Sequence, residues 1–151
     1  MKRTHHIEYQ KYDKLEQMSL EDQELINEAK SMTHKSFAPY SHFCVGAAAR
    51  LQSGKIIYGA NIESEVYPAG LCAERTLLFN AQANHSNDPI VALAIASLPD
   101  ERECYPCGQC RQVLVDTERR QKRPYRVIMS GRDSATVVES AEMLLPFTFI
   151  L

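Results

Sequence analysis

The stretch V-A-L-A-I-A at residues 91–96 is apolar at every position. A strand with one face in water alternates apolar and polar residues, so this uninterrupted run predicts a strand that is covered on both faces. On either side of it, residues 73–83 and 108–120 repeat their apolar side chains at intervals of three or four, as amphipathic helices do. Helices that alternate with a buried strand are typical of an α/β fold.

The remaining pattern extends this α/β arrangement in both directions. Further elements are expected at these positions: a helix at 20–34, strands at 43–51, 55–62, 125–130 and 135–139, and a short helix that ends at Pro146. The order α-β-β-α-β-α-β-β-α predicts a mixed β-sheet sandwiched between helices, a three-layer αβα fold. Residues 1–18 are mostly polar and are interpreted as an N-terminal extension. Residues 19–151 are expected to form one catalytic domain.

Composition limits what the protein can bind. The chain has 151 residues, of which 44% are hydrophobic and 24% charged, as in an ordinary globular domain. Its net charge of −2 lacks the basic excess of a nucleic-acid binder, so we expect no nucleic-acid partner. The N-terminus lacks the apolar region of a secretory signal, and no run is long enough to span a membrane. We therefore expect a cytoplasmic protein whose thiols stay reduced.

Three of the five cysteines lie where predicted helices begin. Cys72 precedes one helix, and Cys107 and Cys110 form a C-x-x-C pair at the start of another. Helix N-termini favour the thiolate over the thiol, and thiolates are good ligands for zinc. A lone cysteine is more often a small buried residue, which is how Cys44 is interpreted. The cluster of three instead predicts one Zn²⁺ per chain.

The number of ligands separates a catalytic zinc site from a structural one. Catalytic sites use three protein ligands and leave a position for water, whereas structural sites are closed by four. Cys104 is available as a fourth ligand, and with it the protein would be a zinc-stabilised binding module. A closed site would leave Glu74 without a catalytic role. Glu74 can face the metal only if Cys72 still lies in the non-helical turn before the helix, and the pattern allows this geometry.

The motifs C-A-E (72–74) and P-C-G-Q-C (106–110) resemble those of the zinc-dependent cytidine deaminases. The similarity to the small, homotetrameric class of that family extends to these stretches: A-P-Y-S-H-F-C-V-G-A-A (38–48), N-I-E (61–63), Y-P-A-G-L-C-A-E-R-T (67–76), P-C-G-Q-C-R-Q-V (106–113) and E-M-L-L-P (142–146). Together they cover roughly residues 20–149. The chain departs from the family in its longer N-terminal arm, in N-H-S-N-D after the 73–83 helix, and in its short tail.

The resemblance implies a metal site and its chemistry. Cys72, Cys107 and Cys110 would bind Zn²⁺, with no other cofactor. Glu74 would be the general acid and base. Arg75 would hydrogen-bond a ligand thiolate and withdraw some of the negative charge that three thiolates place on the metal.

The resemblance also implies contacts with a nucleoside substrate. The implied contacts are Asn61 and Glu63 with the ribose hydroxyls, the backbone of Ala73 and Cys107 with the pyrimidine, Phe43 and Phe149 with the base, and Tyr67 with the site of a neighbouring subunit. We expect a homotetramer with its sites at subunit interfaces.

Each of these residues has an ordinary structural interpretation as well. Phe43 opens a predicted strand and suits core packing, while Asn61 and Glu63 end a strand, where polar residues commonly cap turns. Glu74 in the first turn of a helix is favourable through the helix dipole alone. Arg75 also fits the role of an ordinary charged residue on the surface of a helix. Only their joint occurrence favours an active site.

The implied reaction is hydrolytic deamination of cytidine and 2′-deoxycytidine to uridine and 2′-deoxyuridine with release of ammonia, a step of pyrimidine salvage. Zinc would activate a water molecule, and Glu74 would carry the protons. One alternative substrate is another aminopyrimidine nucleoside, such as a nucleoside antibiotic. Deamination of a polynucleotide is a weaker alternative, because it requires a basic surface for the phosphate backbone.

Overall fold

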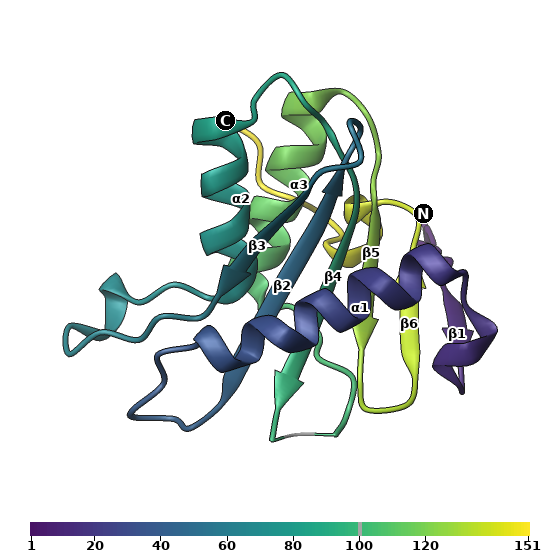
Figure 1. The fold of residues 1–151 in the computed structure, drawn as a ribbon. Coiled ribbons are helices and arrows are strands. Elements are labelled where there is room, and N and C mark those ends of the chain that lie inside the picture. Colours follow the sequence, from purple (N-terminus) through teal and green to yellow (C-terminus); the bar gives the residue numbers. More distant parts are fainter. Residues whose placement is uncertain (100) are drawn as a thin grey trace.

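A six-stranded mixed sheet forms the centre of the molecule (Figure 1). The computed structural model describes residues 1–99 and 101–151. Across the sheet the strands follow the order β1 (Gln10–Tyr12), β6 (Ala135–Val138), β5 (Arg126–Ser130), β4 (Ile90–Leu98), β2 (Cys44–Leu51) and β3 (Ile56–Ala60). Strands β4 and β5 are parallel, and the other neighbouring pairs are antiparallel.

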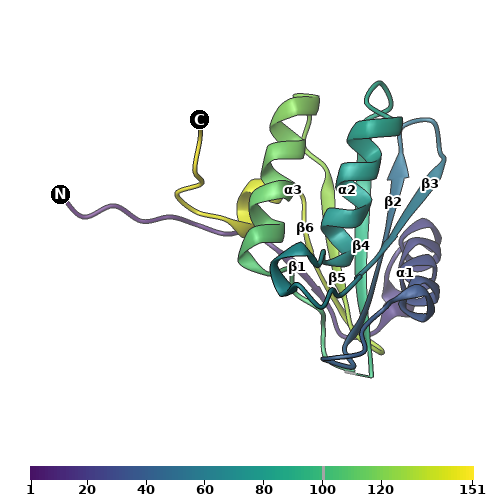
Figure 2. The same cartoon turned by 90° about the vertical axis from the view of Figure 1, so that its left-hand side faces the viewer.

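Helices cover both faces of this sheet, so the predicted three-layer arrangement is confirmed. One face carries α1 (Leu20–Met32), and the other carries α2 (Ala73–Asn84) and α3 (Gly108–Gln121) side by side (Figure 2). Leu93 and Ile95 of β4 pack in the cluster that includes Leu77 of α2 and Leu114 of α3. The intervening Ala94 packs in the cluster formed with α1. Strand β4 has neighbours on both faces, which explains its continuous apolar run.

The predicted elements agree with the observed ones to within a few residues. Helix α1 begins after Ser19, whose Oγ accepts a hydrogen bond from the backbone N–H of Asp22 at 3.2 Å. The short helix expected before Pro146 is a 3₁₀ segment, Ala141–Leu144. Other short 3₁₀ segments lie at Leu15–Gln17, Thr33–Lys35 and Tyr67–Ala69. None of the helices in the described ranges is long and apolar enough to cross a membrane.

The N-terminal extension contains a strand that the sequence pattern does not predict. Residues Gln10–Tyr12 form β1, which pairs antiparallel with β6 at the edge of the sheet. Three residues are too few to show an alternating pattern, and edge strands carry polar side chains on their exposed face. Met18 is buried beside α1, so the chain from β1 to α1 follows the body of the protein.

The strand directions determine where α2 and α3 begin. Strands β3 and β4 both run antiparallel to β2, and they therefore run parallel to each other. Helix α2 follows β3 along the chain and α3 follows β4, and both helices lie on the same face (Figure 2). The N-termini of the two helices consequently lie at the same end of the sheet. Residues just before them, although far apart in sequence, are brought together.

Helix α2 packs against β3 so closely that no side chain fits between them. A Cβ atom built on Gly59 would lie 2.3 Å from the carbonyl oxygen of Ala73 and 2.7 Å from the backbone nitrogen of Leu77. Both are backbone atoms of the first turns of α2, so the helix itself would have to move. Gly59 thus determines how near the start of α2 lies to the sheet.

We expect Gly59→Ala to lower the free energy of unfolding by about 1–3 kcal/mol, the usual cost of overpacking a close contact. The measurement is the midpoint of urea-induced unfolding. Gly108→Ala is the matched control, because a Cβ at Gly108 meets nothing within 4 Å. The control should unfold at the same urea concentration as the wild type or a higher one. Equal effects of the two substitutions would contradict the close packing of α2 on β3.

Candidate active site

Three thiols converge at the N-termini of α2 and α3. The Sγ atoms of Cys72, Cys107 and Cys110 lie within 4.8 Å of one another, and no comparable group of His, Cys, Asp or Glu occurs elsewhere in the described residues. Cys72 and Cys107 are the N-cap residues of α2 and α3 and have extended backbone conformations. Cys110 lies in the first turn of α3 and is fully buried. The sequence-predicted ligand set is therefore brought together.

This donor set fits a zinc ion. Zinc prefers deprotonated sulfur ligands, and tetrahedral Zn–S bonds of about 2.3 Å place two sulfur atoms roughly 3.8 Å apart. The Sγ atoms of Cys72 and Cys107 are 3.9 Å apart. The three cysteines would hold the ion and leave its fourth position open.

Hydrogen bonds distribute the negative charge among the thiols. Those from Cys110 and from Arg75 lower the pKa of Cys72 to about 5. The Arg75 guanidinium lies close to this sulfur, with Nη2 3.7 Å from Sγ of Cys72. The pKa of Cys110 is raised, because its thiol donates to Cys72 and lies in the field of that thiolate and of Glu74. Cys72 accordingly ionises before Cys110.

Glu74 is a buried carboxyl beside the thiols. Its exposed fraction is only 3%, and its neighbours include Cys72 and Cys110. Burial is the main cause that raises the pKa of Glu74 to about 7, and the negative charge of Cys72 adds to it. A carboxyl with such a pKa can both accept and release a proton near neutral pH. Because Cys72 is not yet helical, the carboxyl and the Cys72 thiol share one site, as the sequence analysis required.

The other buried glutamate of the helical layer shows what a structural carboxylate looks like. Glu118 of α3 accepts hydrogen bonds from the backbone N–H groups of Tyr125 and Ala141, at 3.2 and 2.7 Å, and from the Ser140 hydroxyl. These bonds join α3 to the segments around it. Glu74 instead lies among potential metal ligands, an arrangement typical of a catalytic group.

A cavity of about 370 Å³ opens beside Cys72. Besides Cys72, its lining includes four residues that sequence analysis assigned to the site or its surroundings: Asn61, Glu63, Tyr67 and Arg75. It also includes Tyr40, whose ring packs edge-on against that of Tyr67 with 5.6 Å between their centroids. The volume suits a small polar molecule.

Asn61 and Glu63 are held in place by the loop before β2. The Asn61 amide donates to the carbonyl oxygen of Phe43 at 2.8 Å and accepts from the backbone of Val45 at 2.7 Å. The Glu63 carboxylate accepts from the backbone of Tyr40 at 2.9 Å and from the Ser41 hydroxyl. The Ser41 hydroxyl is the main cause that lowers the pKa of Glu63, so this carboxylate stays ionised. Tyr40 and Ser41 were not singled out from the sequence, although the motif A-P-Y-S contains both.

The three residues predicted to contact the base, Ala73, Phe43 and Phe149, lie in different surroundings. Ala73 is fully buried at the start of α2, next to Cys72. Phe43 lines a separate cavity of about 590 Å³ together with Cys104 and Tyr105. Phe149 is exposed near the C-terminus and lines neither this cavity nor the one beside Cys72. Ala73 therefore lies beside Cys72, whereas the backbone of Phe149 contacts α3, where its carbonyl oxygen accepts from Gln112 at 3.1 Å.

Cys104 is buried in the core cluster that includes Leu114 and Ile95, and it does not belong to the group of three converging thiols. Cys44 is the first residue of β2 and is likewise outside this group. This arrangement favours an open metal site with three ligands over a closed site with four.

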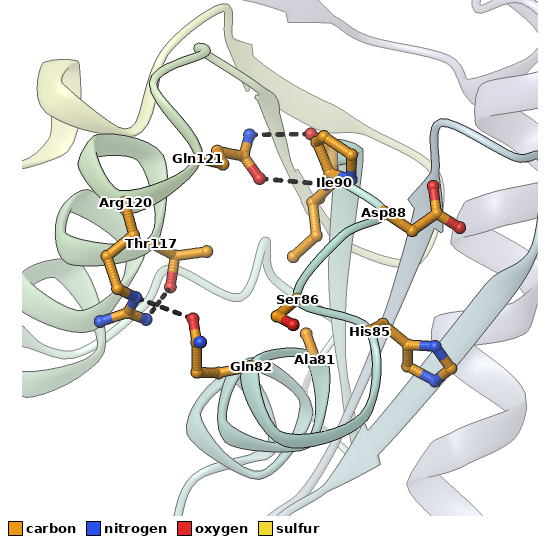
Figure 3. A pocket seen from close by; sticks show the side chains of 10 residues that line it. Ala81, Gln82, His85, Ser86, Asp88, Ile90, Thr117, Arg120 and Gln121 are labelled. Carbon is orange, nitrogen blue, oxygen red and sulfur yellow. Dashed lines mark hydrogen bonds between the residues drawn. The ribbon is translucent and has the colours of Figure 1, made fainter.

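Another cavity lies at the opposite, C-terminal ends of α2 and α3 (Figure 3). Its volume is about 310 Å³. Arg120 donates to the side chains of Gln82 and Thr117 there, and the Gln121 amide bonds both backbone groups of Ile90 (Figure 3). These polar groups bind one another, and none of the three thiols lines this cavity. The chemistry is therefore at the other end of the two helices.

Comparisons with known proteins agree with this geometry. Residues 19–125 match the family model described as "Cytidine and deoxycytidylate deaminase zinc-binding region". The chain is 35% identical to a cytidine deaminase of Sporosarcina psychrophila over 84% of its own length and 90% of that protein. It is 42% identical to one of Halalkalibacterium halodurans, over 64% of this chain and 72% of the relative.

A solved structure shows the same fold. The crystal structure of cytidine deaminase from Burkholderia pseudomallei superposes with a TM-score of 0.75 and 36% sequence identity, covering 87% of this chain and all of the other. The family model spans most of the chain and includes all three converging cysteines together with Glu74. This protein therefore belongs to the family of zinc-dependent cytidine and deoxycytidylate deaminases.

Proposed function

We propose that this protein hydrolyses cytidine and 2′-deoxycytidine to uridine and 2′-deoxyuridine, with release of ammonia, in pyrimidine salvage. The observation that carries the proposal is the burial of Glu74 beside three thiols that fit a zinc ion. Such a site pairs a Lewis acid with a group that moves protons, and hydrolysis of an aminopyrimidine needs both. The relatives named above are cytidine deaminases, which supports the same substrate.

Glu74 carries the protons of the proposed reaction. Zinc held by Cys72, Cys107 and Cys110 supplies a Lewis acid that makes water a nucleophile near neutral pH. Glu74 takes a proton from the attacking water and delivers it to N3 of the pyrimidine, which makes C4 more electrophilic. It then takes the second proton from the hydroxyl that has added to C4 and passes it to the leaving amine, so that the C4–N bond breaks and ammonia departs. The pKa of about 7 suits a group that must both gain and lose a proton in each cycle.

The substrate's sugar is assigned to the cavity beside Cys72. Asn61 uses its oxygen and one of its N–H groups within the protein, which leaves one N–H for a ribose hydroxyl. Three of the four acceptor positions of Glu63 are occupied by Tyr40 and Ser41, and one remains. The same negative charge would repel a 5′-phosphate, so we assign a free nucleoside rather than a nucleotide as substrate. Phe43 and Phe149 remain proposed contacts with the base, together with the backbone of Ala73 and Cys107.

We further propose that the active form is a homotetramer in the cytoplasm. Tyr67 is 75% exposed at the rim of the cavity beside Cys72, and Phe149 is also exposed, so a second copy would cover both and bring further aromatic rings to the site. A cytoplasmic location would keep the three thiols reduced, as zinc binding requires.

The three-ligand site predicts different zinc contents for different cysteine variants. Cys107→Ser should lose most of its zinc, because Ser offers no thiolate. Cys104→Ser should keep one zinc per chain, since Cys104 is not among the converging thiols. Elemental analysis of the purified proteins measures both. Loss of zinc from Cys104→Ser would overturn the open, catalytic site in favour of a closed structural one.

Glu74→Gln should abolish ammonia release from cytidine while zinc content and fold stay intact. Glutamine keeps the shape but cannot gain and lose a proton at neutral pH. A single acid–base contribution is about 10²–10⁴-fold, and Glu74 acts on three atoms, so we expect a loss at or above the upper end. The measurement is ammonia release from cytidine. The same assay of the wild type with single-stranded DNA and with other aminopyrimidine nucleosides separates the alternative substrates. A variant that retains zinc and a tenth of the wild-type rate would remove Glu74 from the mechanism.

Sedimentation velocity at assay concentrations tests the proposed assembly. We expect the mass of four chains for the active protein. Tyr67→Ala should weaken association or lower activity more than Tyr58→Ala, a substitution on the face of the sheet that α1 covers. A monomer with full activity would contradict the tetramer while leaving the chemistry of the metal site untouched.

A further inference from the structure

The carboxylate of Glu103 joins three segments that are distant in sequence. Its Oε1 atom accepts from Lys11 of β1 and from the Ser134 hydroxyl at 2.7 Å. Its Oε2 atom accepts from Thr136 of β6 at 2.6 Å and from the Tyr105 phenol at 2.9 Å. All four acceptor positions of the carboxylate are therefore occupied. Its side chain is only 5% exposed, which makes these bonds stronger than the same bonds in water.

Glu103 stays charged in this environment. Burial by itself would raise the pKa of Glu103, but the hydrogen bonds from Lys11, Thr136 and Ser134 outweigh it and hold the pKa below its ordinary value. The hydrogen bond with Glu103 is in turn the main cause that raises the pKa of Lys11. A charged carboxylate with four donors is a strong and directional anchor.

The anchor acts on the loop that ends at a metal ligand. Tyr105, which donates to Glu103, lies two residues before Cys107. The intervening Pro106 is held from the other side, because Arg111 of α3 donates to its carbonyl oxygen at 2.9 Å. Of the three converging cysteines, Cys107 is the exposed one, so its position depends on this loop more than on core packing.

The base of the loop rests directly on the turn between β5 and β6. The backbone N–H of Cys104 donates to the carbonyl oxygen of Ser130 at 3.1 Å. A Cβ atom on Gly131 would lie 2.8 Å from the carbonyl oxygen of Glu101 and 3.0 Å from the backbone nitrogen of Glu103. The loop is thus attached to this turn at its start, and the bond from Tyr105 to Glu103 secures its end next to Cys107.

We propose that Glu103 is a positioning residue for the metal site: it ties the loop that carries Cys107 to strands β1 and β6, so that zinc retention depends on Lys11 and Tyr105. The N-terminal extension is then part of the support of the metal site. This inference rests on the proposed three-cysteine zinc site. Partners that orient metal ligands in this way typically change metal affinity 10–100-fold when they are removed.

The sharpest test is the rate at which zinc passes from the purified, zinc-loaded protein to an excess of a chromogenic chelator. We expect Tyr105→Phe to release zinc about tenfold faster, since it removes only the hydroxyl that links the loop to Glu103. Tyr58→Phe is the matched control, because Tyr58 is also an exposed tyrosine but lies on the face of the sheet that α1 covers. It should release zinc at the wild-type rate.

The role of the N-terminal strand is tested in the same assay. Lys11→Met removes the ammonium donor and should also speed zinc release about tenfold. Lys11→Arg keeps a charged donor and should release zinc as slowly as the wild type. Hydrogen exchange of residues 101–107 should rise in Tyr105→Phe and Lys11→Met and stay unchanged in Tyr58→Phe. A purely structural effect would lower the melting temperature without this local change.

The outcomes separate this inference from the proposed function. Wild-type rates of zinc release in both Tyr105→Phe and Lys11→Met would overturn the inference and leave the deaminase proposal standing. Faster release from Tyr58→Phe as well would overturn it too, because the effect would not be specific to the loop. A wild-type protein that binds no zinc would overturn both proposals.

Discussion

Because β2 runs antiparallel to both β3 and β4, the helices that follow β3 and β4 begin at the same end of the sheet. Everything at the site depends on this arrangement. It places the N-caps of two helices, Cys72 and Cys107, 3.9 Å apart at their sulfur atoms. Each helix N-terminus carries a partial positive charge, and thiolates are stabilised there. The two helix N-termini, which the sheet brings together, thereby offset part of the electrostatic repulsion among the three sulfur ligands before any metal binds.

The same arrangement determines the environment of Glu74. Glu74 lies in the first turn of α2, which packs closely against Gly59, and it is only 3% exposed. Burial and the neighbouring Cys72 raise the pKa of Glu74, whereas the oxygens of Glu118 and Glu103 are bound by several backbone and side-chain donors. These different surroundings support a structural role for Glu118 and Glu103 and the proposed catalytic role of Glu74.

Much of the fold could be predicted from the sequence, because long elements with a clear period have little choice of structure. The strand at 91–96, which is covered on both faces, and the helices after Cys72 and Cys107 are of this kind. Their observed boundaries agree with the predicted ones to within a few residues. Strand β1 escaped prediction since its three residues show no period and depend on β6 for their hydrogen bonds. The final helix is 3₁₀, a distinction that periodicity cannot make over four residues.

The sequence by itself determined the chemistry that this protein has available: three thiols and a carboxyl at the starts of two helices, in motifs that resemble one enzyme family. Local patterns suffice for this, because residue types and helix starts are properties of short segments. Only the tertiary structure decided which thiols meet, since that depends on strand direction. It also decided that Cys104 lies in the core, that Phe149 is exposed, and that Lys11 reaches Glu103. These are contacts between distant segments, and no local pattern encodes them.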